Sequence, residues 1–342
     1  MSYGRILKPR FYIDTPNWYM SRGVASSEFS VQATNTGNNF VGPDAGFVDA
    51  DLFNMKPNQQ VVFSTSDDST SRADHVLIVI DKQTTNFPTD FVAILNHNMF
   101  SADAMFRVAS SASDITAIDP TALASTEVLN ADDTSDIFTP DYDGDSIITI
   151  NTPTDNRYVA IQIEGESAAF DSTHDLKIGC VMIGELYTMP HSPDLSVKKS
   201  ITFDGNKIQE SAGGNLYSNA QWLEGNQSST TQAGQPFRNQ SAVTYGRTGG
   251  RMSYDMNFSY VNDTDLVPAN IGSTHFGTAN DFVVTDVWNR TGGSHIPFIF
   301  TPDSTADKSG DYLFARFNQD SFSMNQVANN IWNVGLSLRE TW

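Results

Sequence analysis

The first half of the chain alternates between short apolar runs and short polar stretches. Each apolar run has the length of a buried β-strand, and none shows the spacing of an amphipathic helix. Residues typical of turns, chiefly Gly, Pro, Asn and Asp, separate the runs. The pattern predicts a β-sandwich with strands at 75–80, 90–95, 104–108, 146–150, 157–163 and 176–183.

The second half contains two longer segments, 252–260 and 332–339, in which apolar and polar residues alternate strictly. Shorter strands are predicted at 198–203, 296–301 and 312–317. One helix is predicted at 281–290, because a capping-box-like sequence precedes an apolar stripe and a Gly pair follows it. This half is therefore expected to be a β-sandwich or split barrel with one packed helix, and the whole chain all-β.

A domain boundary is predicted where Pro190 and Pro193 interrupt the strand pattern. The predicted domains are 1–190 and 191–342. Charge changes at the same place: 26 acidic and 10 basic residues precede it, and 14 acidic and 10 basic residues follow it. The near-neutral half is easier to pack against copies of itself, because self-repulsion is smaller. Residues 110–140 are expected to form a long loop, and 205–240 a loop or a hairpin.

The net charge of −20 disfavours nucleic acid as a partner, because binding phosphates needs a basic surface. No window approaches the roughly 18 apolar residues of a membrane span, and the first residues lack an apolar signal-peptide core. We therefore expect folding in a cytoplasm and no membrane insertion. The single cysteine, Cys180, lies in an apolar run and is expected to be a small buried hydrophobic residue.

Motifs for catalysis or cofactor binding do not stand out. No nucleophile elbow, phosphate-binding loop or dinucleotide fingerprint occurs, and no two of the six histidines have metal-ligand spacing. Adjacent carboxylates lie in polar loops and are expected by number alone in a chain with 40 acidic residues. We expect no enzymatic activity, no catalytic residues and no cofactor.

An acidic turn, Asp141, Asp143 and Asp145, resembles the start of a calcium loop, with carboxylates at alternate positions and a Gly among them. A complete loop needs a bidentate acid further along, and 149–152 supply none. The alternative is an Asp/Gly turn that leads into a strand. A second candidate is the group Asn96, His97 and Asn98 just after a strand, which is either a ligand-facing loop or a turn that binds its own backbone.

Self-assembly is a further expectation from the residues. Long alternating strands near the end of the chain present sheet edges that symmetric neighbours can cover. Candidate assembly residues are Trp332, Leu336 and Leu338 on the last alternating segment, and the final residue, Trp342.

Residues 91–98 and 104–108, followed by 157–163 and 178–184, resemble the galactose-binding-like jelly-roll module of phage tail proteins. The resemblance covers about residues 40–190. In that module an apolar strand ends in a short His-Asn turn before the next strand. The resemblance implies a jelly-roll β-sandwich that faces outward from a tail and carries loops able to contact a sugar.

Segments 281–290, 297–302, 312–316 and 332–340 are similar to the tail-tube-like split barrel of distal tail and baseplate hub proteins. That family implies a homo-oligomeric ring, often sixfold, around the tail channel, with tail tube and hub proteins as neighbours. Distal tail proteins usually place the ring-forming domain first, whereas here it follows the jelly roll or is split by it.

Two hypotheses of function follow. The first is a structural component of a tailed-phage virion, a tail-tip, distal tail or baseplate protein that forms a ring of its own copies and is assembled in the bacterial host cytoplasm. The alternative is a carbohydrate- or receptor-binding module that attaches the particle to a host surface glycan. A glycan-cleaving enzyme is a third possibility that no catalytic pair supports.

Overall fold

The computed structural model describes residues 8–21, 30–32, 41–66, 75–82, 87–112, 127–128, 137–154, 156–166, 170–202, 208–218, 251–267, 282–303 and 312–341. The predicted loops at 110–140 and 205–240 lie largely outside these residues, as do the capping sequence at 278–281 and Trp342. No helix among the described residues is long and apolar enough to cross a membrane.

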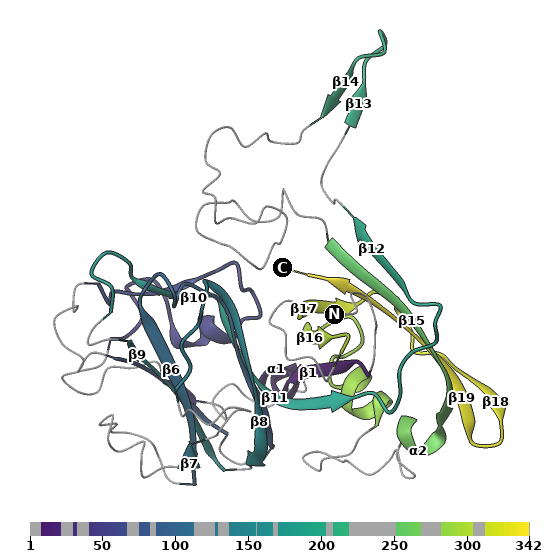
Figure 1. Cartoon of the computed structure of the whole chain (residues 1–342), viewed down its shortest axis with the longest axis horizontal. Helices are drawn as coiled ribbons and strands as arrows, with labels where there is room; N and C mark the ends of the chain where they lie inside the picture. The colour runs from purple at the N-terminus through teal and green to yellow at the C-terminus, as the bar shows by residue number, and fades with distance from the viewer. Residues whose placement is uncertain are drawn as a thin grey trace.

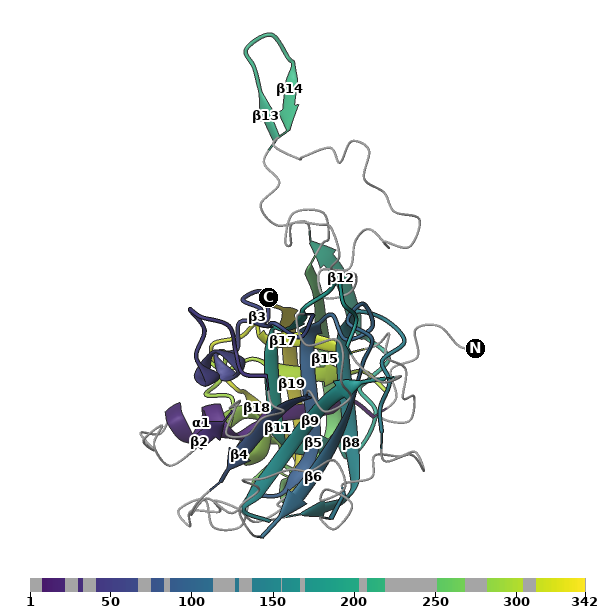
Figure 2. The ribbon, with the colours of Figure 1, turned by 90° about the vertical axis from the view of Figure 1, so that its left-hand side faces the viewer.

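The first half of the chain folds as a sandwich of two β-sheets (Figures 1 and 2). Its strands are β1 (Arg10–Asp14), β2 (Ser30–Gln32), β3 (Val61–Phe63), β4 (His75–Asp81), β5 (Thr89–His97), β6 (Ala104–Ser111), β7 (Glu127–Val128), β8 (Gly144–Thr154), β9 (Tyr158–Gly165), β10 (Leu176–Ile178) and β11 (Cys180–Thr188). One sheet has the order β2-β4-β9-β6-β7, and the facing strands run β1-β11-β5-β8. Strands β3 and β10 form a separate pair.

Alternate side chains of both sheets meet in one apolar core. Ile78 and Ile161 come from the five-stranded sheet, whereas Ile94, Ile148 and Val181 come from the facing strands. All five side chains are less than 5% exposed. Because successive residues of a strand point to opposite faces, this arrangement requires the apolar residues to recur at every second position on the core side. The predicted jelly-roll β-sandwich is confirmed.

The second half continues the larger sheet of the sandwich. Its strands are β12 (Lys198–Thr202), β13 (Ile208–Glu210), β14 (Leu216–Ser218), β15 (Arg251–Asn262), β16 (Phe298–Thr301), β17 (Leu313–Phe317), β18 (Met324–Ala328) and β19 (Ile331–Glu340). The sheet runs β12-β15-β19-β17-β16-β1-β11-β5-β8, and β18 pairs with β19. The described strands form an open sheet and no closed barrel, because β12 and β8 stand at opposite ends of the order. Strands β13 and β14 pair only with each other in the sheet topology.

Strand β1, which the sequence pattern did not indicate, joins the two halves. Tyr12 lies opposite Leu186 of β11 on one side and Ile299 of β16 on the other. Phe11, on the alternate face, is buried in the core of the second half with Phe298 and Phe300. Hydrogen bonds thus cross the predicted boundary between 1–190 and 191–342, and the boundary itself stays a prediction.

In the described part of the chain, four helical segments accompany the strands: α1 (Thr15–Ser21), η2 (Asp49–Phe53), α2 (Asp263–Leu266) and η4 (Val283–Asn289). Segment η4 is the helix expected at 281–290, and it is a π-helical turn that buries Val283 and Val287. The other three were not predicted, because they are too short to show a helical apolar period.

A buried ionic cluster attaches η4 to the first half. The guanidinium of Arg290, which is 2% exposed, contacts the Glu185 carboxylate of β11 at 2.6 Å and the Asp286 carboxylate at 3.6 Å. The same guanidinium lies 5.3 Å from the ring centroid of Trp18 in α1. A buried charge without a partner costs free energy, so the two carboxylates offset the burial of the Arg290 guanidinium between the two halves.

Candidate functional site

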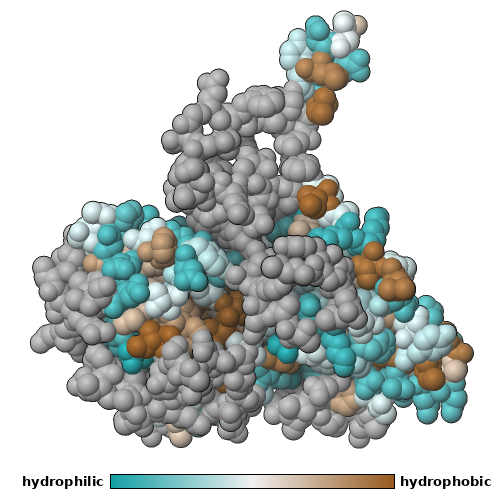
Figure 3. Space-filling model, viewed as in Figure 1, coloured by the Kyte–Doolittle hydropathy of each residue, from teal (hydrophilic) through white to brown (hydrophobic). Residues whose placement is uncertain are grey.

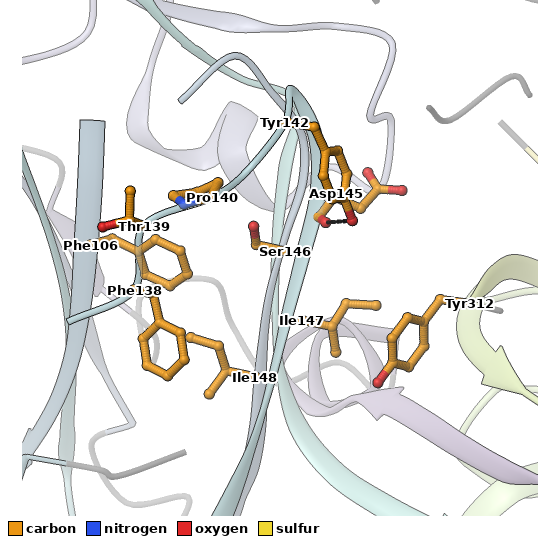
Figure 4. A pocket seen from close by; sticks show the side chains of 10 residues that line it. All are labelled: Phe106, Phe138, Thr139, Pro140, Tyr142, Asp145, Ser146, Ile147, Ile148 and Tyr312. Atoms are coloured by element: carbon orange, nitrogen blue, oxygen red, sulfur yellow. Dashed lines mark hydrogen bonds between the residues drawn. The ribbon is translucent and has the colours of Figure 1, made fainter. Parts of the chain in front are cut away.

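A pocket of about 220 Å³ lies at the outer edge of the sandwich, beside β8 (Figure 4). Its walls come from β6, from the segment 137–142 that leads into β8, from β8 itself, and from one residue of the second half. The lining residues are Phe106, Phe138, Thr139, Pro140, Tyr142, Asp145, Ser146, Ile147, Ile148 and Tyr312. Segments far apart in the sequence therefore contribute to one surface site.

Two aromatic rings form one wall of the pocket. The N–H of Phe106 donates to the carbonyl of Phe138 at 2.9 Å, and the N–H of Phe138 donates to the carbonyl of Phe106 at 2.8 Å. This isolated bridge fixes the two side chains together, with ring centroids 5.5 Å apart and an angle of 30° between the rings. The wall is therefore an apolar, stacked aromatic surface held by backbone hydrogen bonds.

Strand β8 forms the opposite wall. Ser146 and Ile148 point from it toward the two phenylalanine rings, whereas Ile147 lies on the other face beside Tyr312 (Figure 4). The Tyr142 hydroxyl donates to the Asp145 carbonyl at 3.3 Å, which holds the tyrosine over the start of the strand. The alternation of a strand thus presents a hydroxyl and an apolar group to the same cavity.

The chemistry of the pocket is mostly apolar, with a few polar groups. Hydroxyls come from Thr139, Ser146 and the tyrosines, and the one carboxylate is that of Asp145. None of the lining residues that the structure describes is a lysine, an arginine or a histidine. Small-molecule sites have this character, in which apolar walls supply contact and a few polar groups fix orientation.

The candidate residues Asn96, His97 and Asn98 lie at the end of β5 and support the pocket from inside the sandwich. The side-chain amide of Asn96 donates to the Pro57 carbonyl at 2.5 Å, and its backbone N–H donates to the Asp145 carboxylate at 2.9 Å. The side chain of Asn98 donates to the Asp175 carbonyl at 2.8 Å and accepts from the backbone N–H of Lys177 at 2.6 Å.

His97 is fully buried, and its two ring nitrogens are engaged. Nδ1 accepts the Met99 N–H at 3.2 Å, so the proton of the neutral ring belongs on Nε2, which lies 2.8 Å from the Ser146 hydroxyl. Burial lowers the pKa of His97 to about 3. With Asn96 2% exposed and His97 0% exposed, the expectation of a glycan-facing loop is corrected for both side chains. Their polar groups hold the turn together, and His97 also positions a pocket residue, Ser146.

The acidic turn before β8 is engaged by hydrogen bonds. Asp143 accepts from the backbone N–H of Ser101 at 2.9 Å and from its hydroxyl, and Asp145 accepts from Asn96. Asp141 is exposed. Within the described part of the chain, no three His, Cys, Asp or Glu side chains come together in a way that could hold a metal ion. The hydrogen bonds favour the alternative interpretation of Asp141, Asp143 and Asp145, an Asp/Gly turn that leads into a strand.

The assembly residues predicted on the last strand are placed differently from the expectation. Leu336 and Leu338 are 2% and 0% exposed and belong to the chain's own core. Trp332 is half-buried, packs against that core and donates from its indole N–H to the Asp263 carboxylate at 3.0 Å. These side chains lie at alternate positions on the core face of β19, and the backbone edges of the strand are already paired with β15, β17 and β18. The prediction of an assembly surface at Leu336 and Leu338 is corrected.

Sequence reasoning missed most of the pocket. Phe138 lies in the stretch predicted to be a polar loop. Its aromatic side chain, two positions before Pro140, was the signal that this end of the loop packs against the sandwich. Tyr312 gave no signal, because only the fold brings it beside β8. The expectation that Cys180 is buried is confirmed, and burial raises the pKa of its thiol.

The sheets and the pocket define an all-β sandwich protein with an aromatic-walled surface site. No family model matches the chain, and no curated protein matches it. Two solved structures from Clostridium perfringens are similar to part of it: the CpGH89 CBM32-6 module, with 12% identity and a TM-score of 0.28, and the CBM32-1 module of a family 31 glycoside hydrolase, with 13% identity and a TM-score of 0.30. Each comparison covers 46% of this chain and 94% of the other. Similarity at this level carries no argument about function.

Proposed function

We propose that this chain is a non-catalytic binding protein that takes a small neutral saccharide in the pocket beside β8. The observation that carries the proposal is the pairing of a stacked aromatic wall, Phe106 and Phe138, with the hydroxyls of Thr139 and Ser146. Saccharides present apolar C–H faces and polar hydroxyl edges, and such a wall with nearby hydroxyls complements both. A volume of about 220 Å³ is below the roughly 300–1,000 Å³ of sites for drug-sized ligands, which favours one sugar unit.

Binding without cleavage is supported by the acids of the pocket. Hydrolysis of a glycosidic bond generally needs two carboxylates on either side of the bond. Asp145 is the single carboxylate among the described lining residues, and it already accepts the backbone N–H of Asn96. The acidic first half also disfavours negatively charged saccharides, because like charges repel.

The proposal is tested by calorimetric titration of the whole chain with neutral hexose oligosaccharides. Substitution of Phe138→Ala removes half of the aromatic wall and should weaken binding about tenfold, which corresponds to about 1.4 kcal/mol. Phe100→Ala is the matched control, because Phe100 is 60% exposed and does not line the pocket. An affinity that falls equally in both variants, or no heat with any neutral saccharide, would contradict the proposal.

A second candidate function, self-assembly into a tailed-phage structure, is favoured by a separate observation. Exposed apolar side chains gather on β12 and on the β13–β14 hairpin, where Ile201, Ile208, Leu216 and Tyr217 are 57–69% exposed. The resemblance to distal tail and baseplate proteins supports a ring of copies, six in many members of that family, beside the tail tube and hub and built in the host cytoplasm. In that setting the sandwich would attach the particle to a host glycan, so the two functions are compatible in one protein.

Native mass spectrometry of the purified chain tests assembly. The second candidate requires a defined oligomer at micromolar concentration. A strict monomer at every concentration, including in the presence of tail tube and hub proteins, would contradict it while leaving saccharide binding intact.

A further inference from the structure

We infer that the β12 end of the large sheet is a basic docking surface that receives the acidic 1–190 half of a second copy of this chain. The inference rests on the second candidate function, self-assembly, and adds which surface of one copy meets which surface of the next. It is carried by the placement of cations at one end of the sheet in a chain whose net charge is −20.

The strand register gathers these cations on one face. Arg339 of β19 lies opposite Ser253 of β15 on one side and opposite Arg316 of β17 on the other, and Ser253 lies opposite Ser200 of β12. Residues that lie opposite one another point to the same face, so the two arginines share a face. Arg251, opposite Thr202, and Lys198, opposite Asp255, occupy alternate positions of the same strands and therefore the same face. The intervening residues Tyr254, Met256, Leu336 and Leu338 are buried in the core, so the cationic face is the outer one.

The described strand positions on this face carry more cations than carboxylates. Four of these positions hold the cations Lys198, Arg251, Arg316 and Arg339, and one holds the carboxylate of Asp255. The Asp194 carboxylate, from the segment before β12, also reaches β15, where it accepts from the Ser259 hydroxyl at 2.7 Å. Asp255 accepts from the Ser337 hydroxyl at 2.6 Å and lies 4.0 Å from the Lys198 ammonium, whose side chain is 72% exposed. A fifth cation, Lys199, extends over the ring of Tyr254 at the same edge. We call these five cations the basic sheet end.

Strand β12 also leaves an edge that a neighbour can cover. It is the last strand of the sheet order, and its five residues are exposed except Ser200, which is half-buried. An edge strand presents unpaired backbone groups to solvent on its outer side. Ile201, 57% exposed, adds an apolar contact at the same place. Figures 1 and 2 show β12 at the margin of the body, on the side from which the β13–β14 hairpin projects.

Charge complementarity selects the occupant. Residues 1–190 carry 26 acidic and 10 basic residues, so this half of any neighbouring copy attracts the basic sheet end. A polyanion such as nucleic acid would have to approach a chain of net charge −20, which repels it overall. Lysines on an edge strand also oppose its pairing with an identical edge, which disfavours a two-fold contact between two β12 strands.

The contact is therefore heterologous: one copy offers its basic sheet end, and the next offers its acidic half. Because each copy retains the other surface, further copies can add in the same way. Such head-to-tail contacts produce a closed ring or an open filament, depending on the rotation between neighbours.

The first test reverses charge at the edge. The double substitution Lys198→Glu and Lys199→Glu should weaken association of the whole chain at least tenfold, measured by light scattering after size-exclusion chromatography over a dilution series. The control is Lys8→Glu with Lys56→Glu, which makes the same change in net charge at two exposed lysines of the acidic half. Because it makes that half more acidic, this control should retain or strengthen association. Equal effects of the two double variants would overturn the inference.

The second test maps the contact directly. A mixture of ¹⁴N- and ¹⁵N-labelled copies is treated with a zero-length carbodiimide reagent, which joins a lysine to a carboxylate in contact. Mixed-isotope peptides should link Lys198 or Lys199 to acids within 1–190. Two results would overturn the inference and leave self-assembly standing: links from Lys198 or Lys199 only to acids within 191–342, or an oligomer in which neither lysine is linked. A chain that stays monomeric would overturn both the inference and self-assembly.

Discussion

The two halves of the chain place their large apolar side chains differently. In the first half, both faces of the central strands are buried, and only Val48 and Phe100 are exposed among the large apolar residues that the structure describes. In the second half, the described residues with exposed large apolar side chains are Leu195, Ile201, Ile208, Leu216, Tyr217, Tyr260 and Val327. Figure 3 shows brown, apolar atoms on the projecting β13–β14 hairpin and on both parts of the body. The sandwich covers its large apolar side chains with its own fold, whereas the second half leaves more of them exposed. This difference is the basis for proposing that neighbouring copies cover part of the second half.

Polar groups show the same difference. The sandwich buries Asn96 and His97 and pairs them within the fold. The β13–β14 hairpin buries none of its described side chains, and an isolated two-stranded hairpin is marginally stable in water. The first half should therefore be sensitive to single substitutions at these buried positions, and the β13–β14 hairpin should tolerate them in the isolated chain.

The largest expected effect is at Gly179, between β10 and β11. A Cβ atom at this position would lie 2.1 Å from the Pro57 carbonyl oxygen and 2.8 Å from the Asn96 Cβ, so the backbone would have to shift. Gly179→Ala should lower the free energy of unfolding in urea by more than about 3 kcal/mol. The matched substitution in the hairpin turn is Gly213→Ala, where an added Cβ atom would lie no closer than 3.9 Å to any other atom. It should change the free energy of unfolding by less than about 0.5 kcal/mol. Similar losses in both variants would remove the distinction between the halves.

An intermediate effect is expected from the pH dependence set by His97. Its pKa is about 3 when folded, below the ordinary value of 6.5, so the unfolded chain binds the proton first. The stability due to the neutral ring is complete above pH 6.5 and is lost as the pH falls toward 3. At pH 5 the loss is about 2 kcal/mol relative to pH 7.5.

His97→Gln removes this titration and can retain the contact with Ser146. Urea unfolding at pH 7.5 and pH 5 should show a fall in stability that is about 2 kcal/mol smaller in the variant than in the original chain. Asp14 has the opposite effect on the pH dependence of stability, because burial raises its pKa to about 6. Because Asp14 is present in both proteins, its effect cancels in the comparison. An identical fall in stability in both proteins would show that folding does not lower the pKa of His97.

The smallest effect on stability is expected in the hairpin. Leu216→Ser with Tyr217→Ser replaces two side chains that are 69% and 61% exposed, so the unfolding free energy of the isolated chain should change by less than about 0.5 kcal/mol. If neighbours cover the hairpin, the same variant should lose oligomers in native mass spectra. A large loss of stability in a dilute monomer would instead place these residues in an internal core.

The fold was largely predictable from local patterns. Apolar runs and strict alternation identified the strands of both halves, because a buried face imposes a period of two. Alternation reports which face is buried but not what covers it, and for this reason Leu336 and Leu338 were assigned to assembly although they pack in the chain's own core. Strand β1 escaped prediction because residues 10–14 gain their burial from β11 and β16, which are distant in sequence.

The site was less predictable. The turn at Asn96–Asn98 and the acids at 141–145 were found as two separate candidates, and the structure joins them through the hydrogen bond from Asn96 to Asp145. Their polar side chains suggested contact with a ligand, but Asn96, His97, Asp143 and Asp145 have hydrogen-bond partners within the fold. The pocket itself depends on Phe138, which lies shortly before β8 in the sequence, and on Tyr312, which lies in the second half of the chain. Such convergence cannot be read from spacing.

The most direct test of saccharide binding is amide hydrogen exchange of the intact chain with and without neutral hexose oligosaccharides. If the saccharide binds in the pocket beside β8, protection on binding should be centred on 138–148 and on the facing residues of β6 around Phe106. Protection confined to other surfaces, or exchange that is unchanged at saturating saccharide, would contradict the assignment of the pocket beside β8 as the binding site.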